Sequence, residues 1–102
     1  MRVIKPSRVR EYAKQNPDAM TPLMAWLKSA RVAHWSNINQ VRQRHPAADS
    51  VKVASGNTVT VFNIGGNKYR LMVSINYRWG MLYVLRFLTH TEYDQDKWKA
   101  EL

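Results

Sequence analysis

The sequence lacks several kinds of residue, and each absence narrows what the protein can be. It has no cysteine among its 102 residues, which excludes disulfides, thiolate zinc sites and cysteine nucleophiles. Glycine and proline number four each, too few for a disordered or low-complexity chain. The longest apolar runs, Leu23–Leu27 and Met81–Leu85, are too short for a membrane span or a signal-peptide core. We therefore expect one domain over residues 1–102, without a membrane segment and located in the cytoplasm.

Acidic side chains are also scarce, and this scarcity is the strongest compositional signal. Seven Asp and Glu oppose sixteen Lys and Arg, giving a formal net charge of +9 and a pI near 10.3. Four of the seven acids fall in residues 89–102, so residues 1–88 carry fourteen basic and only three acidic side chains. A basic body of this kind is typical of a partner for nucleic acid or the ribosome. An acidic protein partner is the alternative, and both could use the same surface.

The first half of the chain predicts a short strand followed by helices. Arg2–Ile4 is strand-like, and Pro6 opens a helix that Asn16-Pro17 ends. Thr21 before Pro22 predicts an N-cap for a second helix, whose apolar residues recur at helical spacing up to Ala33. Lys28 and Arg31 lie off that apolar stripe. Ser36 to Arg44 predicts a third helical stretch.

The second half predicts a hairpin-connected sheet. Ser50–Ala54, Thr58–Ile64 and Asn67–Tyr77 alternate with a period of two, and Gly65-Gly66 is a two-residue turn signal. Met81–Leu88 is apolar on both faces and predicts a central strand. Thr89 and Glu92 then fit a capping box that opens a short C-terminal helix. The fold class is α+β: a short N-terminal strand and helices packed on an antiparallel β-sheet meander with a short C-terminal helix. The helices should cover one face and leave part of the other open and basic.

Five side chains near the exit of the last predicted strand could carry chemistry. Lys68 and Arg70 are two apart on one strand and should face the same way. Arg86 and His90 are four apart, and His90 and Tyr93 are one helical turn apart. Cations, an imidazole and a phenol together suit cleavage of RNA by its own 2′-hydroxyl, which needs proton transfer and stabilisation of extra phosphate charge. This chemistry requires no cofactor or metal, and the sequence has no metal-ligand spacing.

Each of these residues also has a structural interpretation. Lys68 and Arg70 could be the solvated face of an antiparallel strand. Arg86 is a lone charge in an apolar strand and needs a partner, for which Glu92 or Asp94 is available. His90 could simply begin a helix. His34 and His45 are interpreted as structural, and the aromatic residues Tyr12, Trp26 and Trp35 as core. Residue patterns alone therefore predict a small basic α+β domain that contacts RNA or the ribosome.

Two segments of the sequence resemble a known family when they are taken together. They are Val61-Phe62-Asn63-Ile64-Gly65-Gly66-Asn67-Lys68-Tyr69-Arg70-Leu71 and Thr89-His90-Thr91-Glu92-Tyr93-Asp94. At this separation in a chain of this length, they resemble the HigB-type toxins of bacterial type II toxin–antitoxin systems, within the RelE/ParE superfamily. The opening Met1-Arg2-Val3-Ile4 and Asn16-Pro17-Asp18-Ala19 are similar to the family as well, so the resemblance covers nearly the whole chain.

The resemblance implies a RelE-like fold and a ribosome-dependent endoribonuclease, or mRNA interferase, that inhibits translation and growth. It implies a cognate HigA-like antitoxin as partner, together with the ribosome and mRNA. The site residues it favours are His90, Tyr93, Arg70, Arg86 and Lys68 for catalysis, with Asn67, Lys28 and Arg31 for RNA binding. Asp94 could orient His90, and Glu92 could cap or accept a proton, with capping favoured. A ParE-like toxin that inhibits a topoisomerase by binding, or a non-catalytic RNA- or ribosome-binding module, remains an alternative.

Overall fold

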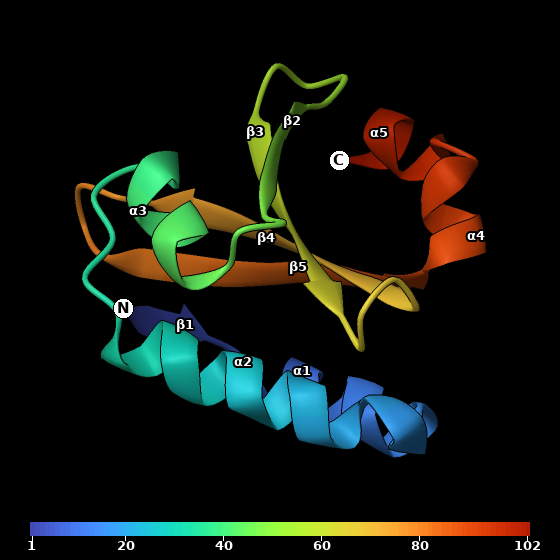
Figure 1. Cartoon of the computed structure of the whole chain (residues 1–102). Coiled ribbons are helices and arrows are strands. Elements are labelled where there is room, and N and C mark those ends of the chain that lie inside the picture. The colour runs from blue at the N-terminus through green and yellow to red at the C-terminus, as the bar shows by residue number, and fades with distance from the viewer.

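A five-stranded sheet forms the centre of the computed structural model, which describes residues 1–102 (Figure 1). The strands lie in the order β1-β5-β4-β3-β2. Their bounds are β1 Arg2–Ile4, β2 Asp49–Lys52, β3 Thr58–Ile64, β4 Tyr69–Asn76 and β5 Met81–Thr89. The helices are α1 Pro6–Gln15, α2 Met20–Val32, α3 Ile38–Arg44, α4 His90–Asp94 and α5 Lys97–Glu101, with a single 3-10 turn at Pro17–Ala19. This confirms the predicted α+β class.

The meander predicted for the second half of the chain is present. Strands β2 to β5 pair antiparallel in sequence order, and β1 adds to the free edge of β5 in the parallel direction. The sheet is therefore mixed. A parallel pair needs a long connection, and the chain between β1 and β5 provides one. β5 is interior along the stretch that β1 covers, Met81–Tyr83, as its apolar composition predicted.

One face of the sheet carries the main hydrophobic core beneath α1 and α2. The core includes the buried α2 residues Leu23, Trp26 and Leu27 and the sheet residues Phe62 and Leu71. These α2 positions recur at the helical period, so one stripe of the helix meets the sheet. Trp26 and Trp35 both pack against Phe62, which confirms their assignment to the core. Tyr12 is partly buried and stacks on Phe87.

The opposite face is less open than the sequence predicted, because the C-terminal segment folds over it (Figure 1). Trp98 of α5 is 1% exposed and joins Val53, Val59, Val61 and Met72 in a second, smaller core. Met72 is on the strand face that was expected to be polar and solvated. The strand is buried on both sides at this point because a tryptophan at the end of the chain returns to cover it.

Helix ends follow the sequence at α1 and α3, but the single short C-terminal helix that was predicted is divided into α4 and α5 at Gln95-Asp96. Asn16 ends α1, as the Asn-Pro pair predicts, and the Asn37 side chain caps α3 by accepting from the Gln40 N–H. The N-cap predicted at Thr21 is wrong. The 3-10 turn continues directly into α2 at Met20, which places Thr21 inside the helix without a cap bond. No helix combines the length and hydrophobicity that a membrane-spanning segment requires.

Candidate active site

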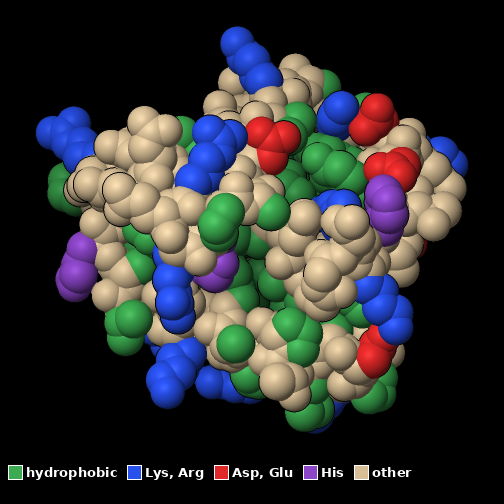
Figure 2. Space-filling model, in the orientation of Figure 1, with side chains coloured by type: hydrophobic (Ala, Val, Ile, Leu, Met, Phe, Trp, Pro, Cys, Tyr) green, Lys and Arg blue, Asp and Glu red, His purple; other side chains and the backbone are tan.

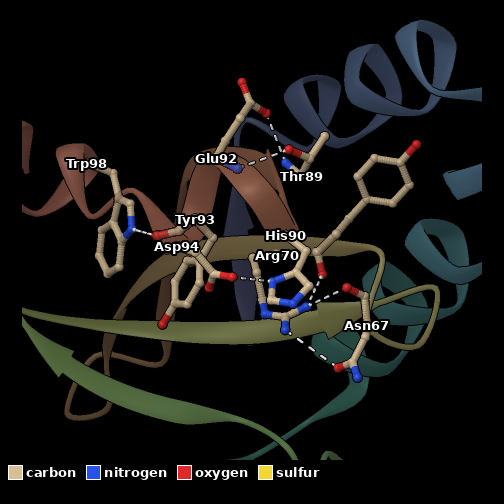
Figure 3. Close-up of polar contacts among 9 residues, drawn as sticks. Asn67, Arg70, Thr89, His90, Glu92, Tyr93, Asp94 and Trp98 are labelled. Carbon is tan, nitrogen blue, oxygen red and sulfur yellow. Dashed lines mark hydrogen bonds and ion pairs between the residues drawn. The ribbon is translucent and has the colours of Figure 1, made fainter.

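The candidate site lies where β5 ends and α4 begins, and a complete capping box fixes this junction (Figure 3). The Thr89 hydroxyl accepts from the Glu92 N–H at 3.2 Å, and the Glu92 carboxylate accepts from the Thr89 N–H at 3.0 Å. The His90 N–H donates to the Lys68 carbonyl, which ties the start of α4 to the neighbouring turn. Glu92 is thus the capping partner, as the sequence favoured. The capping box fixes the start of the five-residue helix α4.

His90 projects from the first turn of α4 and is paired with Asp94 one turn later. The Nδ1 atom of His90 lies 3.1 Å from the Asp94 Oδ2 atom, and both side chains are at least half exposed. A carboxylate at Nδ1 fixes the ring orientation and the tautomer, and leaves Nε2 free for a ligand. The orienting role predicted for Asp94 agrees with this geometry.

Arg70 lies beneath α4 and is 9% exposed, the most deeply buried charged side chain of the protein. Its Nη1 atom donates to the carbonyls of Asn67 and Tyr69, both at 3.1 Å, and its Nη2 atom reaches the Asn67 Oδ1 atom at 3.5 Å. No carboxylate neutralises it. Three of its five N–H groups are therefore used inside the protein, and two are left for another acceptor.

The unused donors of Arg70 are not sealed in the interior. The only buried side-chain nitrogen or oxygen without a hydrogen-bond partner is Nε1 of Trp26. The Nε atom of Arg70 also has no partner, so it must reach the surface. A guanidinium held by carbonyls with a free edge is suited to a phosphate or another oxyanion.

Tyr93 packs between Arg70 and the C-terminal helix. The Arg70 guanidinium lies 5.6 Å from the centre of the Tyr93 ring, and the ring stacks on Trp98 at 5.1 Å. The Trp98 Nε1–H donates to the Tyr93 carbonyl at 3.0 Å. Burial, reinforced by the charge of Asp49, raises the pKa of the Tyr93 phenol, so the hydroxyl stays protonated at neutral pH. Its hydroxyl end points away from His90 (Figure 3).

Lys68 does not lie beside Arg70, contrary to the sequence prediction. It belongs to the turn before β4, so strand alternation does not apply to it, and its ammonium pairs with Asp18 near the start of α2. The Tyr69 hydroxyl also donates to Asp18 at 2.8 Å. Hydrogen bonds from Lys68 and Tyr69 lower the pKa of the Asp18 carboxyl, and Asp18 in turn raises the pKa of Lys68.

The expected acidic partners of Arg86 were also wrong. Its Nη1 atom lies 2.7 Å from the Glu101 Oε2 atom on α5. Neither Glu92 nor Asp94 takes this role, because Glu92 is used by the cap and Asp94 by His90. Arg86 lies opposite Met72 in the register of β4 and β5, beside the smaller core. The ion pair therefore helps to hold α5 against the sheet.

The residues predicted to bind RNA divide between two places. Asn67 belongs to the site, because its carbonyl and side-chain oxygen both hold Arg70. Lys28 and Arg31 are exposed on α2, in the layer on the other side of the sheet from α4 (Figure 1). They are therefore not part of the candidate site at His90.

Sequence patterns missed three residues that shape the site, namely Asp18, Trp98 and Glu101. Asp18 is one of only three acids in residues 1–88, and that scarcity was a signal that it would pair with a nearby cation. Trp98 is the largest apolar side chain of the C-terminal segment, which was a signal that the segment would fold back. Glu101 had no local signal, because it meets Arg86 only after α5 docks.

The arrangement combines an imidazole with a free nitrogen and a guanidinium with free donors on the same side of the sheet. The first can exchange a proton and the second can bind an oxyanion, which are two requirements of phosphodiester cleavage. No group of three or more His, Asp or Glu side chains is close enough together to hold a metal ion.

Comparison with known proteins indicates the same class of protein as the geometry. A protein of Escherichia coli strain K12 named mRNA interferase toxin HigB is 24% identical over 94 residues, which cover 92% of this chain and 88% of that protein. The mRNA interferase HigB proteins of E. coli O157:H7 and Shigella flexneri match to the same extent. The HigB toxin family, described as the RelE-like toxic component of a toxin–antitoxin system, matches residues 19–96. A toxin of such a system implies a cognate antitoxin. The chain therefore belongs to the HigB toxin family of RelE-like toxins.

Proposed function

We propose that this toxin is an endoribonuclease that cleaves translated mRNA on the ribosome and is neutralised by a cognate HigA-like antitoxin. The reaction is attack of the 2′-hydroxyl on the adjacent phosphate, and it requires no metal ion. The observation that carries the proposal is Arg70, a buried guanidinium without a carboxylate, below the helix that carries the His90–Asp94 pair (Figure 3). The names of the HigB relatives as mRNA interferases support the same activity.

His90 is the proton-transfer group in this proposal. Its Nε2 atom takes the proton of the 2′-hydroxyl as the bond between O2′ and phosphorus forms. Asp94 at Nδ1 stabilises the imidazolium that results, in the manner of a carboxylate that orients a histidine base. The bond from phosphorus to O5′ then breaks, and O5′ takes up a proton from water. The products are a 2′,3′-cyclic phosphate and a 5′-hydroxyl.

Arg70 binds the scissile phosphate through its two free donors. Charge on the phosphate oxygens increases in the transition state, so a fixed guanidinium stabilises the transition state more than the substrate. The carbonyls of Asn67 and Tyr69 and the ring of Tyr93 hold the guanidinium in place before RNA arrives. Tyr93 is therefore a positioning residue, whose protonated hydroxyl can in addition donate to the RNA backbone.

Lys68 and Arg86 contribute at longer range in this proposal. Each is paired with a carboxylate, Asp18 or Glu101, so neither offers a full charge to the phosphate until RNA competes with that pairing. Each can attract the RNA backbone once a phosphate displaces its carboxylate. Lys28 and Arg31 on α2 are too far round the sheet for the scissile phosphate and would contact other RNA of the ribosome.

End-group analysis of the RNA fragments tests the chemistry directly. Translating ribosomes with a defined mRNA are incubated with the toxin, and the same mRNA is incubated without ribosomes. We expect fragments only with ribosomes, carrying a 2′,3′-cyclic phosphate or 3′-phosphate and a 5′-hydroxyl. A nuclease that activates water with a metal would typically leave a 5′-phosphate instead. Fragments with 5′-phosphate ends would contradict the 2′-hydroxyl mechanism.

Two variants locate this chemistry in the proposed site. His90→Ala should reduce cleavage by about 100-fold or more, the usual size of a proton-transfer contribution. Arg70→Lys should retain only part of the activity, because an ammonium lacks the fork that binds two phosphate oxygens. Thr91→Ala, an exposed neighbour on the same helix, is the matched control and should cleave normally. A folded His90→Ala protein with full activity would remove His90 from the mechanism, and no cleavage by the unmodified toxin under any condition would favour a toxin that acts by binding.

A further inference from the structure

A second feature of the surface lies at the end of the sheet opposite the His90 site. There the turn between β4 and β5, strand β1 and the connection between α2 and α3 come together (Figure 1). They surround an open hollow of about 520 Å³. The side chains that give it its chemistry are Arg2, His34, Trp35, Tyr77, Arg78 and Trp79. Nothing in the mechanism above uses this hollow.

Trp79 is the feature that sets the hollow apart. The other three tryptophans are between 1% and 7% exposed, whereas Trp79 is 69% exposed at the tip of a turn. The Arg78 guanidinium lies 5.5 Å from the centre of the Trp79 ring, so one ring face is already paired with a cation. The Asn76 side chain accepts from the Trp79 N–H at 3.0 Å and fixes the backbone of the turn. An indole held in this way is a flat surface on which a planar group can stack.

The charge around the hollow has one sign only. No acidic residue lines it, and Arg2 and Arg78 supply two cations. A second open hollow of about 380 Å³ adjoins it at His34 and Trp35 and adds the side chains of Gln40, Gln43 and Arg44, again with no acid. In Figure 2 the acidic side chains lie toward the side of α4 and α5, away from this end of the molecule. The combined surface is a groove with aromatic rings, amides and three arginines.

The groove and the His90 site cannot contact the same nucleotide. Arg70 and Arg78 stand at opposite ends of β4, and eight residues of extended chain span about 25 Å. A ligand in the groove therefore contacts a different segment of RNA from the one that is cleaved.

We propose that this groove, from Trp79 past His34 to Arg44, is a binding site for single-stranded RNA. A base stacks on the free face of Trp79, and the phosphates that follow it are bound by Arg2, Arg78 and Arg44. A single strand carries both bases and phosphates, and the groove offers an exposed indole for the first and arginines for the second. The Gln43 amide can donate to and accept from base edges, and the Gln40 amide can donate, since its Oε1 atom already accepts from the Ser36 N–H. An acidic protein segment would match the charge of the groove but would not explain an exposed indole paired with arginine. The site does not depend on cleavage at His90.

Binding of a short RNA that cannot be cleaved tests the proposal. The probe is a 2′-O-methyl hexanucleotide, which lacks the 2′-hydroxyl needed for the reaction and carries a 5′-fluorescein label. Fluorescence anisotropy of the label measures the affinity of every variant, and tryptophan fluorescence of the unmodified protein is a second signal. Since Trp79 is the exposed tryptophan, stacking of a base on it should quench the emission that acrylamide also quenches. Trp79→Ala should weaken binding about tenfold, equivalent to about 1.4 kcal/mol. Trp79→Phe should recover most of the affinity, because a phenyl ring can also stack.

Two comparisons separate stacking from general charge. Tyr83→Ala removes another exposed aromatic residue, away from the groove, and should change the affinity less than twofold. The defect of Trp79→Ala should persist at high salt, whereas the defect of Arg78→Ala should shrink, because only phosphate contacts release counterions. Equal affinities for Trp79→Ala and the unmodified protein would overturn the proposal. So would loss of antitoxin binding with unchanged RNA binding, which would identify the groove as a protein interface. Because the hexanucleotide cannot be cleaved, its binding is measured whether or not the toxin cleaves RNA, so failure of this proposal is distinguished from failure of the proposed function.

Discussion

The two faces of the sheet are built on different principles. Beneath α1 and α2, seventeen buried residues form one continuous core that is apolar or aromatic throughout. Beneath α4 and α5, only five apolar residues are buried, and the Arg70 guanidinium is buried on the same face. The first face has the area to supply most of the hydrophobic free energy of folding. The second face is small and places a charged group where burial is costly unless its donors are satisfied.

This difference separates stability from function. The Arg70 guanidinium would be better solvated in water than in the protein. Three carbonyl contacts and the Tyr93 ring hold it below α4. A family member that only had to fold would gain by an apolar residue there. The cost is tolerable because the opposite face stabilises the shared strands β3, β4 and β5. The comparison predicts that substitutions on the first face unfold the protein, and that those on the second mainly disturb the site.

The largest effect should come from removing one large side chain from each face. Phe62→Ala opens a cavity between Trp26, Trp35 and His45 and should lower the free energy of unfolding by about 3–5 kcal/mol. Trp98→Ala should cost about 2 kcal/mol, because α5 is terminal and can detach without unfolding the sheet. Urea denaturation followed by circular dichroism measures both values.

Activity should reverse the order of these two variants. Trp98 stacks on Tyr93 and bonds its carbonyl, so its loss frees the ring that covers Arg70. Trp98→Ala, assayed where it is fully folded, should therefore cleave RNA more slowly than the unmodified toxin, whereas the folded fraction of Phe62→Ala should cleave normally. Equal losses of stability in the two variants, or a fully active Trp98→Ala protein, would contradict the assignment of stability to one face and activity to the other.

The second test compares two threonines that look alike in the sequence. Thr89 caps α4 through a reciprocal pair of hydrogen bonds, whereas Thr21 lies within α2 and caps nothing. Thr89→Ala should lower stability by about 1 kcal/mol, and Thr21→Ala should be neutral or slightly stabilising because alanine favours helix. The same thermal melts measure both. A loss of stability in Thr21→Ala equal to that in Thr89→Ala would show that the hydrogen bonds of the capping box contribute little.

The contrast between these threonines also shows how far the sequence alone could predict the fold. Strands β3, β4 and β5 and the caps at Asn16 and Thr89 follow from local periodicity and turn chemistry, which the structure preserves. The prediction of a cap at Thr21 failed because the 3-10 turn at Pro17–Ala19 leads directly into the helix before Thr21. No local sequence pattern indicates that the helix begins there. The parallel pairing of β1 with β5 also depends on contacts between distant segments.

The site divides in the same way. His90, Asp94 and Glu92 were placed correctly because helical spacing alone relates them. The partners of Lys68 and Arg86 could not be predicted, since Asp18 and Glu101 approach them only after α2 and α5 dock. The burial of Arg70 was missed for the same reason: alternation indicated which face it takes, but not that Trp98 and Tyr93 would cover that face.

The smallest expected effect is a pH dependence that originates on the apolar face. His45 lies there against the rings of Trp35 and Phe62, with its Nε2 atom 3.0 Å from the Ser29 hydroxyl. Burial, with the charge of Arg44, lowers the pKa of His45 below its usual value of 6.5. The unfolded chain therefore binds a proton more readily than the folded protein as the pH falls below about 6.5. Stability should decline from pH 7 toward the lowered pKa of His45, and this contribution should become constant below that value. His45→Gln should flatten the decline in melting temperature between pH 7.5 and 5, even if it lowers stability at every pH. Parallel melting curves for His45→Gln and the unmodified protein across that range would show that the histidine is as free to take a proton when folded as when unfolded.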